Sequence, residues 1–251
     1  MSHSYWQRGL RVDLAGFRDS VAVQVVADSA ATTLDEDWAV LDTMRWLPFG
    51  SPRPFLDRGP RGVAGLNNGG DGSYPSGVFS AALYGVTGGL GLEARVSIPV
   101  TRSQWQQLQL SIVSARAWPV ERWDRLTTGS PARVSFGSEA CGAGYPNGEG
   151  LAAVGSVAAI AGGRGRVAPA DSTWRLGAWH RIRLQVFPDG ECGVAIDGVP
   201  IWRSPGRLPL DQQYRVLLAG SSAGTKVLVG PFQVWRGVRK DIDWSVVDRR
   251  Q

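Results

Sequence analysis

Apolar and polar residues alternate most regularly in the last third of the chain. From Trp179 to Val186, His180 or an aliphatic side chain occupies every second position, and arginine or glutamine lies between them. This period of two is that of a strand with one buried face. The Asp189-Gly190 pair that follows supplies the positive φ that a tight hairpin needs. Glu191 to Gly198 is therefore predicted to be the second strand of this hairpin.

The same alternation predicts a second hairpin closer to the C-terminus. Tyr214 to Leu218 is expected to pair with Lys226–Val229 and Phe232–Trp235 across a loop from Gly220 to Gly224. No helical period of 3.6 competes with the period of two in this region.

Further strands are predicted by alternating or short apolar runs in the preceding part of the chain. Leu34 to Leu47 fits either a short helix or a strand pair, whereas Gly50–Gly62 and Gly69–Gly77 have the glycine and proline content of loops. The expected strands are Phe17–Val26, Val78–Leu83, Leu92–Ile98, Trp105–Val113, Arg133–Phe136 and Ala152–Ile160.

These segments predict an all-β fold, a two-sheet antiparallel β-sandwich (jelly roll) with short N- and C-terminal arms. All-β sandwiches of about 200 to 250 residues form one domain, so a single domain is expected for the 251 residues. The predicted division is an N-terminal arm at 1–16, the sandwich at 17–236 and a C-terminal arm at 237–251.

Several short runs together resemble the concanavalin A-like lectin and glucanase domains, in particular their laminin-G-like branch. The resemblance spans Phe17 to Trp235, and it implies a jelly roll of two antiparallel sheets, one of them concave. It says little about activity, because one fold carries many functions. The runs that carry it are Ser76–Ser80, Gly89–Val96, Trp105-Gln106, Gly177–His180, Ile196–Gly198 and Val229–Trp235.

The acidic residues do not predict glycoside hydrolysis. Retaining enzymes need two carboxyl groups about 5 to 5.5 Å apart, and alternating acids on one strand supply them most simply. No Glu-x-Asp-x-Glu run is present, and Glu93 and Arg95 are expected to neutralise each other. We interpret His180 as a hydrogen-bonded core residue. The other acids, Asp35-Glu36-Asp37, Asp241 with Asp243, and Glu191 with Asp197, are interpreted as turn or surface residues, so no enzyme and no cofactor is predicted.

Metal sites and a disulfide are not favoured by the sequence. Cys141 and Cys192 are the only cysteines and are expected to be two buried reduced thiols, although the sequence leaves open whether they pair. The oxygen-rich loop around Asp71 could hold calcium, but a turn is the preferred interpretation, and no metal is predicted.

Charge and hydropathy bear on location and partners. The formal net charge is +5, nearly all of the basic residues are arginine, and no compact basic stripe predicts nucleic-acid binding. Met1 to Ala15 lacks an apolar signal region, and Leu151 to Ala161 is too short to span a bilayer. A cytoplasmic location is expected, with attachment to the inner face of a membrane through the basic chain ends as an alternative.

Binding is the remaining class of function, and two surfaces are candidates. Glu93 and Arg95 face away from the predicted core, and so do Trp105, Gln107 and Gln109 on the next predicted strand. If these two strands are neighbours on the concave sheet, they form a ligand face with the groups that sugar hydroxyls require. The alternative is a flat, solvated or protein-docking face.

The second surface consists of the arms, where tryptophan and arginine, the residues that anchor interfaces, recur. We expect Trp6, Arg8, Arg11, Arg239 and Trp244 to bind other polypeptides, unless the arms pack back on their own sandwich. The favoured function is a non-catalytic lectin-like accessory or scaffolding subunit that binds neighbouring proteins in a larger, membrane-associated assembly. A carbohydrate-binding module and an atypical glycoside hydrolase are the alternatives.

Overall fold

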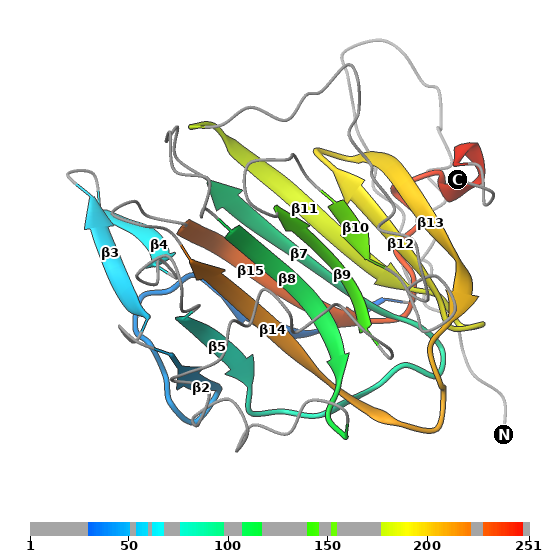
Figure 1. Cartoon of the computed structure of the whole chain (residues 1–251), viewed down its shortest axis with the longest axis horizontal. Coiled ribbons are helices and arrows are strands. Elements are labelled where there is room, and N and C mark those ends of the chain that lie inside the picture. The colour runs from blue at the N-terminus through cyan, green and yellow to red at the C-terminus, as the bar shows by residue number, and fades with distance from the viewer. Residues whose placement is uncertain are drawn as a thin grey trace, which may run out of the picture.

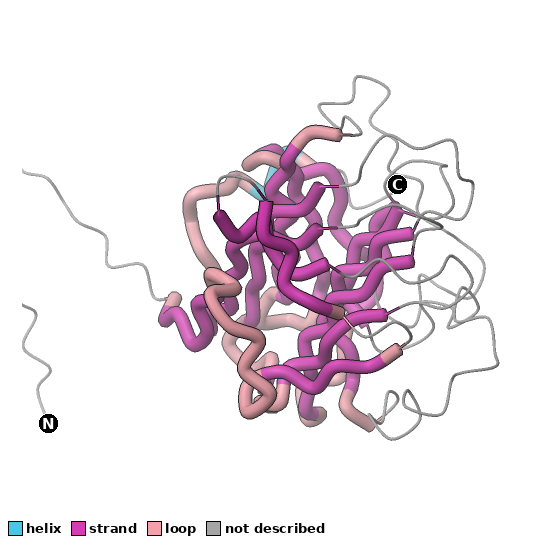
Figure 2. Tube along the Cα trace, turned by 90° about the vertical axis from the view of Figure 1, so that its left-hand side faces the viewer, coloured by secondary structure: helices cyan, strands magenta, loops and turns pink. Residues whose placement is uncertain are grey.

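The protein is a sandwich of two antiparallel sheets, seen face-on in Figure 1 and from the side in Figure 2. The predicted all-β fold is therefore confirmed. The computed structural model describes residues 30–50, 54–59, 62–67, 76–97, 107–116, 140–145, 152–154, 177–221 and 228–247.

Within these residues, the larger sheet has eight strands. Their order is β13 (Val199–Arg207), β12 (Glu191–Ile196), β11 (Trp179–Val186), β7 (Leu90–Ser97), β15 (Leu228–Arg236), β4 (Gly62–Asn67) and β3 (Phe55–Gly59). β1 (Ala31–Glu36) also pairs with β15, so strands from opposite ends of the described chain lie side by side.

The second sheet has seven strands in the same described residues. Their order is β10 (Ala152–Val154), β9 (Ala140–Tyr145), β8 (Gln107–Ser114), β14 (Gln213–Ser221), β5 (Ser76–Ser80) and β2 (Trp46–Phe49), and the short β6 (Tyr84–Gly85) pairs with β14.

The main core lies between the two sheets. Every second residue of the central strands points into it and is buried, as the alternation predicts. From the larger sheet come Leu92, Ala94 and Val96 of β7, Ile182, Leu184 and Val186 of β11, and Phe232 and Val234 of β15; from the smaller sheet come Leu110, Ile112, Val216 and Leu218.

The first predicted hairpin is confirmed. β11 pairs with β12 from Ile182 opposite Ile196 to Val186 opposite Cys192. Its turn differs in one detail from the prediction, since Gly190 has a positive φ of 85° and Asp189 does not. The Phe187 amide and the Gly190 amide both bond across this turn, so one left-handed residue is sufficient to reverse the chain.

The second predicted hairpin is wrong. β14 pairs with β5, β6 and β8 in the seven-stranded sheet, whereas β15 pairs with β1, β4 and β7 in the eight-stranded sheet. The chain therefore crosses from one layer to the other between Ser221 and Leu228. Alternation fixes which face of each strand is buried, but two strands that face one another across a core show the same pattern as two strands in one sheet.

Other expectations in the first half of the chain are partly corrected. Leu34 to Leu47 is neither a helix nor a strand pair, because β1 and β2 lie in different sheets. The Pro-rich segment Gly50–Gly62 contains β3, which forms a hairpin with β4. The segments Phe17–Val26, Arg133–Phe136, 68–75 and 155–160, with their predicted strands and turn, lie outside the described residues.

A disulfide joins the two layers. Cys141 in β9 and Cys192 in β12 are bonded, and both are fully buried. The expectation of two reduced thiols is therefore wrong. Both residues point into the core from opposite sheets, which brings together two side chains 51 positions apart in the sequence. Sequence spacing carries no information about such a contact.

The segment that follows β15 packs on the outer face of the eight-stranded sheet. Gln185 donates to the Gly237 carbonyl oxygen at 3.0 Å, and the rings of Trp244 and Phe187 meet edge to face at 5.5 Å. Ala195 and Ile242 complete a small apolar cluster there. In the residues that the structure describes, no helix is both long and apolar enough to cross a membrane.

Candidate ligand-binding face

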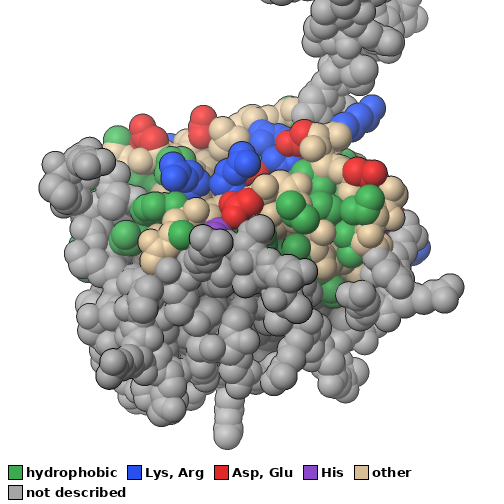
Figure 3. Space-filling model, turned by 90° about the horizontal axis from the view of Figure 1, so that it is seen from above, with side chains coloured by type: hydrophobic (Ala, Val, Ile, Leu, Met, Phe, Trp, Pro, Cys, Tyr) green, Lys and Arg blue, Asp and Glu red, His purple; other side chains and the backbone are tan. Residues whose placement is uncertain are grey.

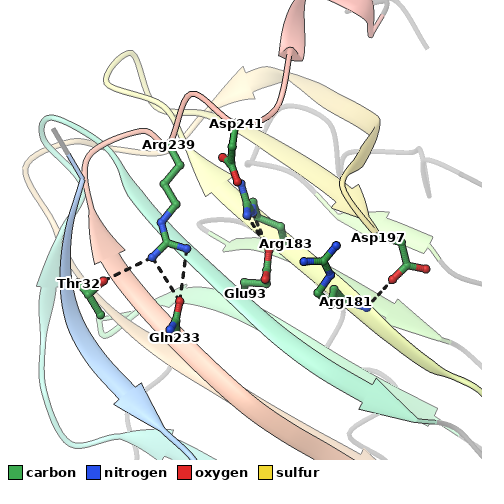
Figure 4. A network of polar contacts seen from close by, with 8 residues as sticks. All are labelled: Thr32, Glu93, Arg181, Arg183, Asp197, Gln233, Arg239 and Asp241. Atoms are coloured by element: carbon green, nitrogen blue, oxygen red, sulfur yellow. Dashed lines mark hydrogen bonds and ion pairs between the residues drawn. The ribbon is translucent and has the colours of Figure 1, made fainter. Parts of the chain in front are cut away.

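The outer face of the eight-stranded sheet carries a polar network centred on β7 and β11 (Figure 4). Because Leu92, Ala94 and Val96 point into the core, Glu93 and Arg95 point outward from β7. The antiparallel register places Arg183 opposite Glu93 and Arg181 opposite Arg95.

Arg183 is the most constrained of these side chains. Its guanidinium lies 2.7 Å from a Glu93 carboxylate oxygen and 2.6 Å from Asp241 of the C-terminal segment. Burial lowers the pKa of Arg183, but the hydrogen bond to Asp241 and the Glu93 carboxylate outweigh it, so the net pKa is raised. The hydrogen bond from Arg183 lowers the pKa of Asp241. The expectation that Glu93 neutralises Arg95 is wrong, since the cross-strand neighbour supplies the partner.

An exposed tryptophan lies beside this network. Trp179, at the start of β11, is 37% exposed, and the Arg95 guanidinium carbon is 5.5 Å from its ring centroid. The ring lies over the β-bulge of β15, where an added Cβ on Gly230 would come within 3.0 Å of it. On the core side, the Trp38 indole N–H donates to the Gly230 carbonyl oxygen at 2.6 Å. The bulge is thus held on its core side by the Trp38 hydrogen bond, and the missing side chain of Gly230 leaves room for the Trp179 ring on its outer side.

Asp197 borders the face at the hairpin between β12 and β13. It has a φ of 51°, and with Gly198 at 87° it forms the two-residue turn. One of its carboxylate oxygens accepts from the Arg181 amide at 2.8 Å, and the other lies 2.7 Å from His180 Nδ1. His180 is 5% exposed, so the interpretation as a hydrogen-bonded core histidine is confirmed.

The predicted ligand face is not one surface. Glu93 and Arg95 lie on β7 of the eight-stranded sheet, whereas Gln107 and Gln109 lie on β8 of the seven-stranded sheet. The two strands follow each other in sequence but belong to different layers, so their outward positions face opposite sides. Trp105 lies outside the described residues, and the side chains of Gln107 and Gln109 are not described.

The predicted partner-binding residues of the C-terminal arm contact their own sandwich. Trp244 is 6% exposed against Phe187 and is a packing residue rather than a surface anchor, which corrects its predicted role. The Arg239 guanidinium lies 3.8 Å from the Trp235 ring centroid and bonds to Gln233 and Thr32. Trp6, Arg8 and Arg11 lie outside the described residues, as does Asp71 of the candidate calcium loop.

The acidic residues singled out in the sequence do not form a catalytic pair in the described structure. Glu191 and Asp197 stand at opposite ends of β12, about 20 Å apart at 3.3 Å per residue, whereas hydrolysis needs about 5 to 9.5 Å. Glu36 is 3% exposed and accepts hydrogen bonds from the Trp46 indole and the Trp38 amide. Asp243 caps the short 3₁₀ turn at Trp244–Val246.

Sequence reasoning named Glu93 and Arg95 of this face but missed Trp179, Arg181 and Arg183. The signal was present, because Trp179, Arg181 and Arg183 are the outward positions of the most regular strand. The strand next to them could not be predicted from the sequence, since the pairing of β11 with β7 joins segments almost 90 residues apart.

Seen from above, arginine and lysine side chains gather among acidic ones on the described surface (Figure 3).

No protein-family model matches the sequence, and no curated protein matches it in sequence. Solved structures match its fold. Lectin II from Ulex europaeus has a TM-score of 0.56 at 11% identity, covering 84% of this chain and all of that one. The potassium-bound carbohydrate recognition domain of Emp46p has a TM-score of 0.54 at 8% identity, covering 80% of this chain and 94% of that chain.

A third neighbour, reported with endo-acting O-glycanases of the human gut microbiota that initiate mucin breakdown, has a TM-score of 0.53 at 15% identity. It covers 83% of this chain and 100% of that chain. These structures share the two-sheet β-sandwich of this chain, which confirms the fold that the sequence resemblance implies. The more detailed laminin-G-like assignment stays a prediction. Since lectin domains and a glycanase-related chain share this fold, function has to be argued from the face itself.

Proposed function

We propose that the protein is a non-catalytic carbohydrate-binding domain that recognises its ligand on the outer face of β7 and β11. The supporting observation is Trp179, a partly exposed aromatic ring held over a sheet next to the Arg95 guanidinium. An apolar surface with a few fixed polar groups is the usual composition of a small-ligand site. The site rests on strands rather than loops, so its geometry is set before the ligand arrives.

Binding without hydrolysis is favoured by the engagement of the nearby acids. Glu93 is held by Arg183, and Asp197 is held by His180 and the Arg181 amide. A general acid for glycoside cleavage needs a raised pKa and a second carboxyl group across the scissile bond. The carboxylate across from Glu93 is that of Asp241, but Arg183 lies between the two and pairs with both. The hydrogen bond from Arg183 lowers the pKa of Asp241, the opposite of what a general acid needs.

The test compares Trp179→Ala with the wild type, first on a glycan array and then by calorimetry on the best ligand. We expect binding to weaken at least about tenfold, the effect of removing an anchoring aromatic residue, and Trp179→Phe to retain part of it. Phe55→Ala is the matched control, because Phe55 is 50% exposed in the same sheet, on edge strand β3. A protein that binds no glycan, or binds one equally well without Trp179, would rule out this function.

The accessory or scaffolding role in a membrane-associated assembly is the second candidate. It is favoured by exposed apolar side chains in two loops that the Ala81 amide ties together by donating to the Arg45 carbonyl oxygen. Met44 is 84% exposed and Leu83 45% exposed in these loops. We expect a Met44→Ser, Leu83→Ser variant to lose a partner that co-purifies stoichiometrically with the wild type, while Phe55→Ala keeps it. A wild type that elutes alone from its native source contradicts this role.

A further inference from the structure

Two neighbouring cross-strand pairs on the candidate face differ in charge. Arg183 lies opposite Glu93, and the two form an ion pair. Two residues along the same strands, Arg181 lies opposite Arg95. Directly opposed residues have Cβ atoms about 4.5 to 5.5 Å apart, and like charges at that distance destabilise a sheet. The ion pair of Arg183 and Glu93 thus stabilises the sheet, whereas the opposed arginines Arg95 and Arg181 destabilise it in the free protein.

In the described part of the chain, neither Arg95 nor Arg181 forms an ion pair with a carboxylate. Arg95 contacts the Trp179 ring, and Arg181 uses its backbone amide, not its guanidinium, to reach Asp197. Both side chains are exposed. The carboxylate of Glu93 pairs with Arg183, and that of Asp197 accepts from the Arg181 backbone amide and lies 2.7 Å from His180 Nδ1 rather than bonding to a guanidinium.

Two adjacent guanidinium groups suit an oxyanion. Each offers a planar fork of N–H donors that matches a carboxylate or a sulfate, and an anion between them removes their mutual repulsion. Trp179 lies opposite Ser97, two positions from this pair on the same face. A sugar ring placed on the indole would therefore bring its acidic substituent to the arginines.

We propose that the ligand of this face is an acidic glycan, whose oxyanion binds between Arg95 and Arg181 while the sugar ring packs on Trp179. This inference rests on the proposed carbohydrate binding and names its ligand class. The shared chemistry is an oxyanion on a sugar, which a uronic-acid carboxylate or a sulfate ester supplies.

Calorimetric titration with four polymers tests the proposal: polygalacturonate, its fully methyl-esterified form, dextran sulfate and dextran. We expect tight binding to at least one charged polymer and at least about tenfold weaker binding to its neutral counterpart. The preferred charged polymer identifies the source of the oxyanion. Binding should weaken as salt is raised, because exposed charges are screened.

Variants of the two arginines give the second readout. Arg95→Gln and Arg181→Gln should each weaken binding of the charged polymer at least about tenfold. The thermal midpoint of the free protein should stay unchanged or rise, because the repulsion is relieved. A residue needed only for the sheet would lower that midpoint. Arg236→Gln is the control, since Arg236 is an exposed arginine at the end of β15.

The outcomes separate this inference from the function on which it rests. Trp179-dependent binding of dextran or the methyl ester, unaffected by Arg95→Gln and Arg181→Gln, overturns the acidic ligand and leaves carbohydrate binding intact. Equal losses in Arg236→Gln and the two arginine variants also overturn it, because diffuse charge then explains the binding. If neither charged polymer binds, the acidic ligand is overturned, whereas carbohydrate binding itself is overturned only if the glycan array also shows no ligand.

Discussion

Gly230 controls the position of the exposed indole at the scale of a single residue. A Cβ at this position would lie 3.0 Å from the Trp179 ring and 3.3 Å from the Arg95 Cβ, so the ring must move outward. We predict that Gly230→Ala weakens glycan binding several-fold while costing no more than about 1 to 3 kcal/mol of stability, the range for overpacking. Glycan titration and urea unfolding measure the two effects. Unchanged affinity would show that ring position is unimportant.

Asp241 gives a residue-scale prediction about pH. Its pKa is lowered from the ordinary value of 3.8, chiefly by the hydrogen bond from Arg183. A carboxyl group with a lowered folded-state pKa contributes stability above pH 3.8, and this contribution is lost as the pH falls through the folded-state pKa. Asp241→Asn should therefore lower stability at pH 7 by less than about 1 kcal/mol, given its exposure.

The difference between Asp241→Asn and the wild type should vanish at a pH well below 3.8. Urea unfolding at neutral and acid pH measures it, with the exposed Asp211→Asn as the control. A difference that persists in strong acid would show that the carboxylate charge is not its cause.

For single residues, the sequence predicted which side chains point into the core, but it did not predict which side chains contact one another. The burial of His180 followed from its place in an alternating strand. The partner of Glu93 did not, because Arg95 is its neighbour in sequence and Arg183 its neighbour in space. The disulfide was missed for the same reason, since its two cysteines come from strands of different sheets.

At the scale of elements, the segment after β15 is part of the sandwich. Trp244 packs on Phe187 and over Gly193, where a side chain would collide with its ring. We predict that Trp244→Ala destabilises the protein by about 2 to 4 kcal/mol, since a large aromatic side chain is lost from a buried contact. Urea unfolding is the measurement, and Val246→Ala, at a 69% exposed position, should change stability by less than about 0.5 kcal/mol. Equal effects would mean that the segment is not packed.

The strands themselves were largely predictable, and their assembly was not. β7, β11 and β12 follow the alternation closely, so their inward faces were known in advance. The position of β14 relative to β15 was assigned wrongly, because both have apolar inward faces and short connections usually join paired strands. The predicted ligand face failed through the same ambiguity between β7 and β8.

At the scale of the whole molecule, the disulfide links the two layers across the core. It closes a loop of 51 residues, for which loop-closure entropy predicts a contribution of about 4 kcal/mol. We predict that a Cys141→Ala, Cys192→Ala variant unfolds at markedly lower urea concentration than the wild type. The wild type after reduction should resemble the variant. If both unfold at the wild-type midpoint, the bond adds nothing.

The same bond bears on where the protein resides. Structural disulfides persist in oxidising compartments and are rare in the cytosol, which opposes the expected cytoplasmic location. We predict that protein isolated from its native source has no free thiols when titrated in denaturant. Two titratable thiols per chain would favour the cytoplasm.

The pairing of β1 with β15 has a consequence for biosynthesis. A ribosome delivers the first of these strands long before the second, with most of the described chain between them. Until Leu228–Arg236 emerges, β1 lacks its hydrogen-bonding neighbour, and β7 lacks one of its two flanking strands. Topologies dominated by such distant contacts fold slowly, because chain closure precedes the contacts that reward it. The nascent polypeptide therefore completes its larger layer only after Leu228–Arg236 has emerged, and until then its apolar strands need shielding from one another and from other chains.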